Sequence, residues 1–486
     1  MKNTYTQNIE IQEEKKVEKV ATTENGMTTN TSSLDDCVDL FFIIGSMRGK
    51  KKERLIEKFT KAFSQNSLLG TKILFWARDV RGGAGERQIF RDIISHLVSL
   101  SPDVVRKNLS LIPEYGRWDD ILVLMGTELE DDVIDLIKTE LRNGNGLCAK
   151  WMPRKGNVSN KLRRSFGVTP KEYRQLLVNL TNVVETPMCA KEWEKIDYSK
   201  IPSLAASRYQ KSFYKNDEKR YDKYVQDLVD GKTKVNAGAL YPYDVIKSLQ
   251  NGGNEDVCQK QWEGLPNYME DNNDIILPVV DVSGSMGCPA GNNPNLSCLD
   301  VAISLGLYIS ERNEGTFKDC FLTFSSSPQL QYLKGNLTQR LNQLRMSEWE
   351  MSTNLLATFD LILNQALGHK ISEDKMPTKI IVLSDMEFDS ATSSMWGGSV
   401  PKWNPTAIEG IREKYKRAGY KMPNLIFWNL NARNDNFPVK HDDNNTALVS
   451  GFSPSILKAI LASKEITPLS IMLDTIEGNR YQPITV

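Results

Sequence analysis

Histidines and closely spaced cysteines are scarce in this sequence of 486 residues. It contains three histidines (His96, His369 and His441) and seven cysteines, with no C-x-x-C pair. A zinc knuckle or a disulfide framework needs cysteines at regular spacings, and a serine nucleophile needs a histidine base. None of the three histidines lies in a stretch typical of a catalytic site. The sequence therefore disfavours these classes and predicts reduced thiols in a cytoplasmic protein.

Net charge and long apolar runs are absent as well. Sixty-one basic residues balance sixty-one acidic ones, so any surface for a polyanion must come from a local excess of charge. No apolar stretch approaches the length of a membrane span, and the polar start "MKNTYTQNIEIQEEKK" lacks a signal-peptide core. We therefore expect no membrane partner.

The hydrophobic pattern divides the chain into four segments. Residues 1–35 have few large apolar side chains, which predicts a disordered arm. Residues 36–250 repeat apolar positions at three- and four-residue intervals, which predicts an all-helical domain of packed helices. Residues 251–272 are polar and contain glycines, as expected for a linker. Residues 273–486 alternate β-rich and helical runs and form the last domain.

This alternation predicts the fold of the last segment. The strand-like runs "IILPVV", "CFLTF", "KIIVLS" and "NLIFWNL" are apolar almost throughout and are separated by helical patterns. Such strands are typical of a mostly parallel, doubly wound sheet that is covered on both faces. The run "LVSGFSPSILKAILAS" is expected to form a last helix, with Ser453 as its N-cap and Pro454 at its first position.

Oxygen-bearing side chains gather where these strands end. Asp281, Ser283 and Ser285 follow the first strand in "DVSGSM", and Asp385 ends the strand "KIIVLSD". The loop "WEMSTN" adds Thr353 before a helix. Two carboxylates with several hydroxyls suit a hard cation such as Mg²⁺ or Mn²⁺. The alternative is that the aspartate and the serines merely cap a turn.

These segments resemble the metal-ion-dependent adhesion site of von Willebrand factor A domains. The resemblance implies metal ligation by Asp281, Ser283, Ser285, Thr353 and Asp385. Mg²⁺ keeps open positions for a carboxylate or a phosphate of a partner, and we expect a protein partner that donates a carboxylate. Because no general base with a tuned pKa stands out, we expect docking and no enzymatic activity.

A basic band precedes the linker. Residues 149–177 contain one acid, Glu172, among many bases. These bases are Lys150, Arg154, Lys155, Lys161, Arg163, Arg164, Lys171 and Arg174. The later stretch "SRYQKSFYKNDEKRYDKY" interleaves aromatics with bases, a pattern that can stack unpaired bases of RNA. A solvated helix face is the alternative. For the glycine loop "RGGAGER", a helix–helix turn is favoured over an anion site.

Further motifs resemble the family catalogued as domain of unknown function 2828. They are "RDVRGGAGER", "YGRWDDI", "AKWMPRK", "DYSKIPSLAASRY" and "VNAGALYPYDV". The architecture is also similar to that of Ro ribonucleoprotein autoantigens, in which a ring of HEAT-like helical repeats precedes an A domain. This resemblance implies a scaffold that binds structured or misfolded RNA. The alternative is a metal-dependent protein-docking adaptor without RNA.

Overall fold

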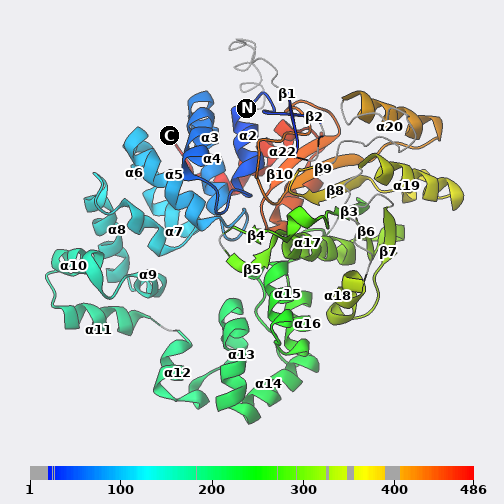
Figure 1. Ribbon diagram of the computed structural model, residues 1–486. Coiled ribbons are helices and arrows are strands. Elements are labelled where there is room, and N and C mark those ends of the chain that lie inside the picture. The colour runs from blue at the N-terminus through cyan, green and yellow to red at the C-terminus, as the bar shows by residue number, and fades with distance from the viewer. Residues whose placement is uncertain are drawn as a thin grey trace.

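The computed structural model describes residues 20–24, 26, 28–181, 183–270, 272–291, 293–323, 328–346, 355–388 and 405–486. Helices make up most of the first half, and a six-stranded sheet organises the second half (Figure 1). Within the described ranges no helix has both the length and the apolar character needed to cross a membrane. The expected order, helices first and a mostly parallel sheet after them, is confirmed.

The helices of the first half are amphipathic, with one apolar face that packs into the core. The helix α3 (Lys52–Gln65) buries Leu55, Phe59 and Ala62 on one face, as the three- and four-residue spacing predicts. The remaining helices are α2 (Asp36–Ile44), α4 (Ser67–Arg78), α5 (Arg87–Leu100), α6 (Pro102–Lys107), α7 (Ile112–Tyr115), α8 (Glu130–Arg142), α9 (Gly146–Trp151), α10 (Gly156–Ser165), α11 (Pro170–Leu180), α12 (Glu185–Ala190), α13 (Ser203–Asn216), α14 (Glu218–Val229), α15 (Pro242–Gln250) and α16 (Glu255–Glu263).

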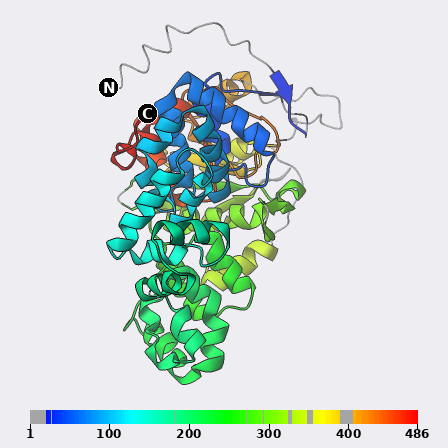
Figure 2. The same ribbon diagram turned by 90° about the vertical axis from the view of Figure 1, so that its left-hand side faces the viewer.

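These helices follow an arc that leaves the sheet and returns to it. In Figure 1 the chain runs from α2 beside the sheet, through α8 to α11, to α12–α14 at the far end. Figure 2 shows the same helices extending away from the sheet in the perpendicular view. The helices α15 and α16 then lead back, and α15 packs against α17 (Cys298–Arg312) of the second half. Both ends of the arc therefore contact the sheet-containing half.

The sheet has the strand order β10-β9-β8-β3-β6-β7. Its strands are β3 (Ile276–Val280), β6 (Cys320–Thr323), β7 (Gln329–Tyr332), β8 (Lys379–Ser384), β9 (Asn424–Asn429) and β10 (Thr446–Ser450). Every pairing is parallel except that of the edge strand β7, which runs antiparallel to β6. A separate hairpin, β4 (Pro289–Ala290) and β5 (Asn293–Ser297), lies between β3 and α17 in the chain.

Helices cover the sheet on opposite sides. Figure 1 shows α17 and α18 (Leu337–Met346) on one side, with α19 (Leu355–Gly368) and α20 (Pro405–Arg417) on the other. The four predicted strands are present, whereas β7 and β10 were not predicted. The run "TALVS" was assigned in part to a helix, because a short buried apolar run has no periodicity that separates strand from helix. Ser453 does cap the turn that begins at Pro454, as predicted, and α21 (Leu457–Ala462) and α22 (Pro468–Ile476) follow.

Two predicted segments differ from the structure. Within the predicted disordered arm 1–35, the strands β1 (Val20–Thr22) and β2 (Thr28–Asn30) pair with each other, and Asn30 bridges to Phe437. The predicted linker 251–272 contains α16, whose Trp262 is fully buried and donates to Glu311. Both segments are locally polar. The sequence pattern therefore did not reveal the side chains that pack against distant parts of the chain.

The two halves share one hydrophobic core. Its buried members run from Cys37 in α2 to Ile484 near the end of the chain. At the junction a Cβ on Gly45 would lie 2.7 Å from the Cα of Gly451, so the two backbones are in direct contact. A small second core forms under α13 and α14 at the far end of the arc, around Phe213 and Tyr221.

Candidate divalent-cation site

Asp281 and Asp385 lie on adjacent strands at the carboxyl edge of the sheet. Asp281 follows β3 and Asp385 follows β8, and the register pairs Val280 with Leu383. The chain leaves β3 for β6 on one side, whereas β8 lies on the other, so the strand order reverses between β3 and β8. Ligands of open α/β sheets bind outside the carboxyl ends of strands at such a reversal. The structure thus brings the two predicted carboxylates together at the expected edge.

Hydrogen bonds fix the Asp281 carboxylate in place. Its Oδ1 accepts from the backbone N–H of Ser283 (2.9 Å), and its Oδ2 accepts from the hydroxyl of Ser384 (2.6 Å). The backbone N–H of Asp281 donates to the Leu383 carbonyl (3.0 Å), which continues the ladder between the strands. Asp281 is fully buried. A buried carboxylate held in this way is ordered before any ligand arrives.

Asp385 is less completely satisfied. The backbone N–H of Glu387 donates to its Oδ1 (3.3 Å), aided by Met386, which has a left-handed φ of 65°. Its Oδ2 is buried and has no hydrogen-bond partner among the described residues, and Arg433 Nη1 lies 3.7 Å away. Burial and the neighbouring Asp281 carboxylate raise the pKa of Asp385 to about 7. The pair therefore favours binding of either a proton or a cation.

Two of the predicted hydroxyls lie beside these carboxylates. The turn Gly284–Gly287 (η5) follows Asp281, and the Oγ atoms of Ser283 and Ser285 are 3.0 Å apart. Thr353 lies outside the described residues. Among those that are described, no group of three or more His, Cys, Asp or Glu side chains is arranged to hold a metal ion. Any cation here would depend on hydroxyl oxygens as well as on the two aspartates.

A cysteine pair borders this loop. Cys288 directly follows η5, and its Sγ lies 3.7 Å from that of Cys298 at the start of α17. The hydrogen bond between the two thiols, together with Lys50 and Arg433, lowers the pKa of Cys288 to about 6. The edge of the site thus carries a polarised thiol as well as oxygen groups.

The predicted basic band lies on the outer part of the arc. Lys150 is on α9, Lys161, Arg163 and Arg164 are on α10, and Lys171 and Arg174 are on α11, with Arg154 and Lys155 just before α10. Arg154, Lys155, Arg164 and Lys171 are exposed, and within the described part of the chain none forms an ion pair. Lys161 is paired with Glu130 (2.6 Å). Figure 1 places α10 and α11 on the arc, away from the sheet.

The interleaved aromatics of the next stretch lie mostly in the core. Phe213 and Tyr221 are buried, and the Tyr209 hydroxyl donates to Glu185 (3.0 Å). The rings of Phe213 and Tyr221 contact Tyr198 and are unavailable to stack on bases, whereas Tyr214 of the same stretch is exposed. The helical spacing of these aromatics is equally typical of a helix face that packs into a core.

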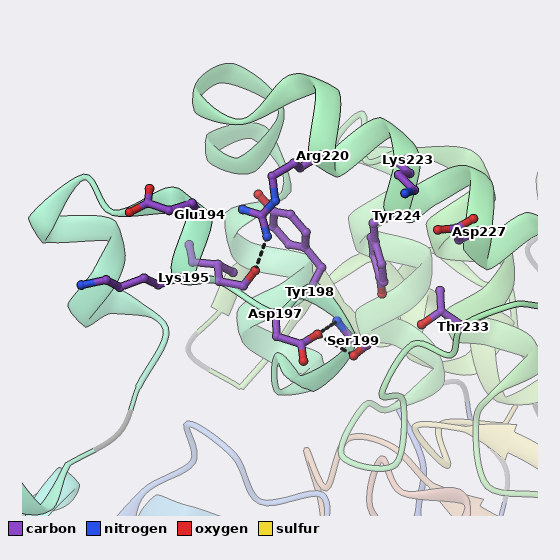
Figure 3. Close-up of a pocket in the computed structure, with 11 residues that line it drawn as sticks. Glu194, Lys195, Asp197, Tyr198, Ser199, Arg220, Lys223, Tyr224, Asp227 and Thr233 are labelled. Carbon is purple, nitrogen blue, oxygen red and sulfur yellow. Dashed lines mark hydrogen bonds between the residues drawn. The ribbon is translucent and has the colours of Figure 1, made fainter.

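A pocket of about 500 Å³ lies beside this small core. Figure 3 shows the side chains that line it. Arg220 donates to the carbonyls of Trp193 (2.6 Å) and Ile196 (2.7 Å), so it joins two segments of the wall. The lining mixes the acids Glu194, Asp197 and Asp227 with the bases Lys195, Arg220 and Lys223. This mixture of charges does not suit a polyanion.

The glycine loop is a turn between helices, as favoured. A Cβ on Gly83 would lie 1.9 Å from the carbonyl oxygen of Trp76, so a side chain does not fit there. The neighbouring acids form ion pairs, but with residues other than Arg81 and Arg87. Asp79 binds Arg480, Glu86 binds Arg48 (2.7 Å) and Asp92 binds Lys52 (3.5 Å). These partners lie too far along the chain for spacing to reveal them.

Sequence reasoning missed two side chains of the site. Ser384 directly precedes Asp385, but a strand residue is expected to face away from its neighbour, and its bond to Asp281 depends on the strand register. Arg433 approaches Asp385 from the loop after β9. No local pattern marks a contact between residues so far apart.

The comparisons with known proteins place the chain in a family. It belongs to the family described as "Domain of unknown function (DUF2828)", whose model matches residues 23–145 and 154–275, just over half of the chain. This membership was predicted from the motifs and is confirmed. Residues 276–478 match a second model, "Domain of unknown function (DUF7788)".

One relative is similar over most of its length. The chain is 28% identical to "Uncharacterized protein L728" of Acanthamoeba polyphaga mimivirus over 524 aligned positions, which cover 96% of this chain and 88% of the relative. No solved structure matches this chain. Function therefore has to be argued from the site.

Proposed function

We propose that the sheet-containing half is a von Willebrand A-like domain that docks a protein partner through a divalent cation. The main support is the Oδ2 atom of Asp385, which is buried beside Asp281 and accepts no hydrogen bond within 3.5 Å among the described residues, while the Ser285 side chain lies close enough to lower the pKa of this carboxyl. Arg433 Nη1 lies 3.7 Å from this oxygen, so one partly exposed arginine faces two buried neighbouring carboxylates, and a proton or a further cation would stabilise the pair. Mg²⁺ or Mn²⁺ matches this set of oxygen donors.

In this proposal the protein supplies most of the coordination. Asp281 and Asp385 provide the charge, and Ser283, Ser285 and Thr353 provide hydroxyl oxygens. Ser384 orients Asp281 through its hydrogen bond. The bound cation supplies positive charge and open positions for a carboxylate of the partner. The role is docking and not turnover.

Calorimetric titration with Mg²⁺ and Mn²⁺ tests the cation site. Wild-type protein is expected to bind one equivalent, and Asp281→Ala is expected to weaken binding at least about tenfold, because one of the two carboxylates is lost. Asp360→Ala is the matched control, since that aspartate forms an exposed pair with Lys414 on α19 and α20. Equal uptake by wild type and Asp281→Ala would refute the assignment, provided both proteins have the same circular-dichroism spectrum.

A second role rests on the basic band. We propose that the helical arc, as a HEAT-like or Ro-like scaffold, binds structured or misfolded RNA through phosphate contacts on α10 and α11. The supporting observation is the exposure of Arg154, Lys155, Arg164 and Lys171, with no ion pair in the described structure. Cations not engaged by protein carboxylates can displace counterions from a phosphate backbone. The buried aromatics favour shape recognition over base stacking.

Filter binding with a hairpin RNA at several salt concentrations tests this role. Changing these four cations to glutamine is expected to weaken binding with little dependence on RNA sequence and to make the salt dependence shallower. The control changes Arg412, Lys416, Arg417 and Lys421, which are exposed on or near α20. If the wild type, the band variant and the control all bind the RNA equally weakly, the chain is better explained as a cation-dependent protein adaptor without RNA.

A further inference from the structure

Cys288 and Cys298 face each other where the β4–β5 hairpin meets α17. The hairpin pairs Pro289 with Ser297, so the two cysteines flank it, and the N–H of Cys298 donates to the carbonyl of Cys288 (3.0 Å). Opposed residues of an antiparallel pair have Cα atoms about 4.5–5.5 Å apart, which lies within the span of about 4.4–6.8 Å that a disulfide bridges. Their Sγ atoms are 3.7 Å apart. Rotation of the side chains therefore brings the sulfurs to bonding distance with little backbone movement.

The two thiols differ in access. Cys288 is partly exposed, whereas Cys298 is buried. The Nδ2 of Asn431 donates to the Sγ of Cys288 (3.1 Å), and the cations Lys50 and Arg433 act on the same sulfur. Hydrogen-bond donors and cations stabilise a thiolate, and a partly exposed thiolate is the form that reacts. Cys288 is thus placed to react first, with Cys298 behind it.

The other cysteines lack this arrangement. Cys189 is exposed, and Cys37, Cys148, Cys258 and Cys320 are buried. Within the described part of the chain, the pair Cys288 and Cys298 is the one in which two Sγ atoms are in hydrogen-bond contact. Cys189 therefore provides an internal comparison for exposure without a partner thiol.

We propose that Cys288 and Cys298 form a redox-reactive dithiol site that takes a small-molecule disulfide as its oxidant. The Cys288 thiolate attacks one sulfur of the small molecule, breaks its S–S bond and releases one thiolate, which takes a proton from water. The Cys298 thiol then loses its proton to solvent and attacks the Sγ of Cys288, which releases the second thiol. The two cysteines are oxidised to one disulfide, and the small disulfide is reduced to two thiols.

The new bond would close the base of the β4–β5 hairpin. It would join the residue that follows η5 to the first residue of α17, and η5 carries Ser285 of the candidate cation site. The dithiol site is defined by its own chemistry, so its test needs no cation.

Peptide mapping of the full chain tests the proposal. The reduced protein is incubated with oxidised glutathione in the presence of EDTA, alkylated, digested without reductant and analysed by mass spectrometry. The expected product is a peptide that contains both Cys288 and Cys298, carries no alkyl group on either and has two hydrogens fewer than the reduced peptide, because the chain has no lysine or arginine between them. Free thiols at both positions, under conditions that modify Cys189, would overturn the proposal.

Three variants separate the roles of the two thiols. Cys298→Ser is expected to accumulate glutathione on Cys288, because the resolving thiol is missing. Cys288→Ser is expected to leave Cys298 at least about tenfold less modified than Cys288 is in the first variant, since it is buried. Cys189→Ser should form the disulfide as wild type does. Stable glutathione on Cys288 of the wild type, or ready modification of Cys298 without Cys288, would contradict the mechanism. The wild-type map decides the question even if a variant fails to fold.

Discussion

At the scale of single residues, the site depends on side chains that orient its carboxylates. Ser384 is buried, donates to Asp281 Oδ2 (2.6 Å) and accepts from the N–H of Met386 (3.0 Å). One hydroxyl thereby connects the ends of the two strands that carry the aspartates. Groups that orient metal ligands typically influence affinity by about 10–100-fold.

Ser384→Ala is therefore expected to weaken Mg²⁺ binding by about 10-fold while the fold persists. The variant keeps both aspartates and removes the hydrogen bond that holds Asp281. Ser384→Thr keeps the hydroxyl and should restore most of the affinity. Calorimetry compares the three proteins. Unchanged affinity in Ser384→Ala would show that Asp281 needs no such support.

The pH dependence of cation binding follows from Asp385. Burial and Asp281 raise the pKa of Asp385 to about 7, with Glu387 adding to the increase and Arg433 lying close by. A bound cation requires the ionised form of Asp385. At a pH below its pKa, the carboxyl must therefore lose a proton when the cation binds. Apparent Mg²⁺ affinity should fall by up to about tenfold per pH unit below about pH 7 and level off above it.

Titrations in buffers of different ionisation enthalpy measure this proton directly. Near pH 6, wild-type protein should release close to one proton for each cation bound. Asp385→Asn should bind weakly and release none. Affinity that is independent of pH between about 6 and 8 would mean that Asp385 is already ionised without the cation.

At the scale of elements, a buried charge cluster fixes the start of the arc. Asp120 in the 3-10 turn Trp118–Leu124 accepts from Arg78 of α4 and from Arg91 of α5, each at 2.7 Å, and it is fully buried. A Cβ on Gly116 would lie 2.4 Å from its carboxylate, which leaves no room for a larger residue. One carboxylate therefore joins three elements.

Asp120→Asn is expected to lower the free energy of unfolding by about 3–5 kcal/mol, because the buried Arg78 loses its counter-ion and the partly buried Arg91 keeps only Asp119. The midpoint of thermal unfolding, followed by circular dichroism, measures the effect. Asp132→Asn is the control, since its pair with Arg106 is exposed and should contribute little. Equal midpoints for the two variants would show that Asp120 is not a structural anchor.

At the scale of the whole molecule, the helical half and the sheet-containing half pack together as one unit. They share one core, and the C-terminal Arg480 and Tyr481 both bind Asp79 of the helical half. The contact between Gly45 and Gly451 brings the backbones of α2 and the β10 segment together. Unfolding of one half would expose core residues of the other.

Scanning calorimetry should therefore show one main unfolding transition. Gly45→Ala is expected to lower its temperature, because the added methyl meets the backbone at Gly451, whereas Gly410→Ala has open space and should not. Two well-separated transitions in the wild type would contradict a shared core.

The sequence predicted those features that depend on local periodicity. The helix that buries Leu55 and Phe59, the strand before Asp281 and the strand before Asp385 all follow from spacing and burial. The packing of α16 through Trp262 and the pairing of Asp79 with Arg480 did not, because each depends on residues far apart in the chain. Within the site the two aspartates were predicted, but Ser384 was not.

The central claim is that a cation binds between Asp281 and Asp385. Anomalous diffraction from crystals soaked in Mn²⁺ tests it most directly. The account predicts one strong anomalous peak within coordinating distance of both carboxylates, about 2.0–2.3 Å from oxygen, and its loss in Asp281→Ala. Occupied Mn²⁺ elsewhere on the molecule with no peak at this edge of the sheet would contradict the account.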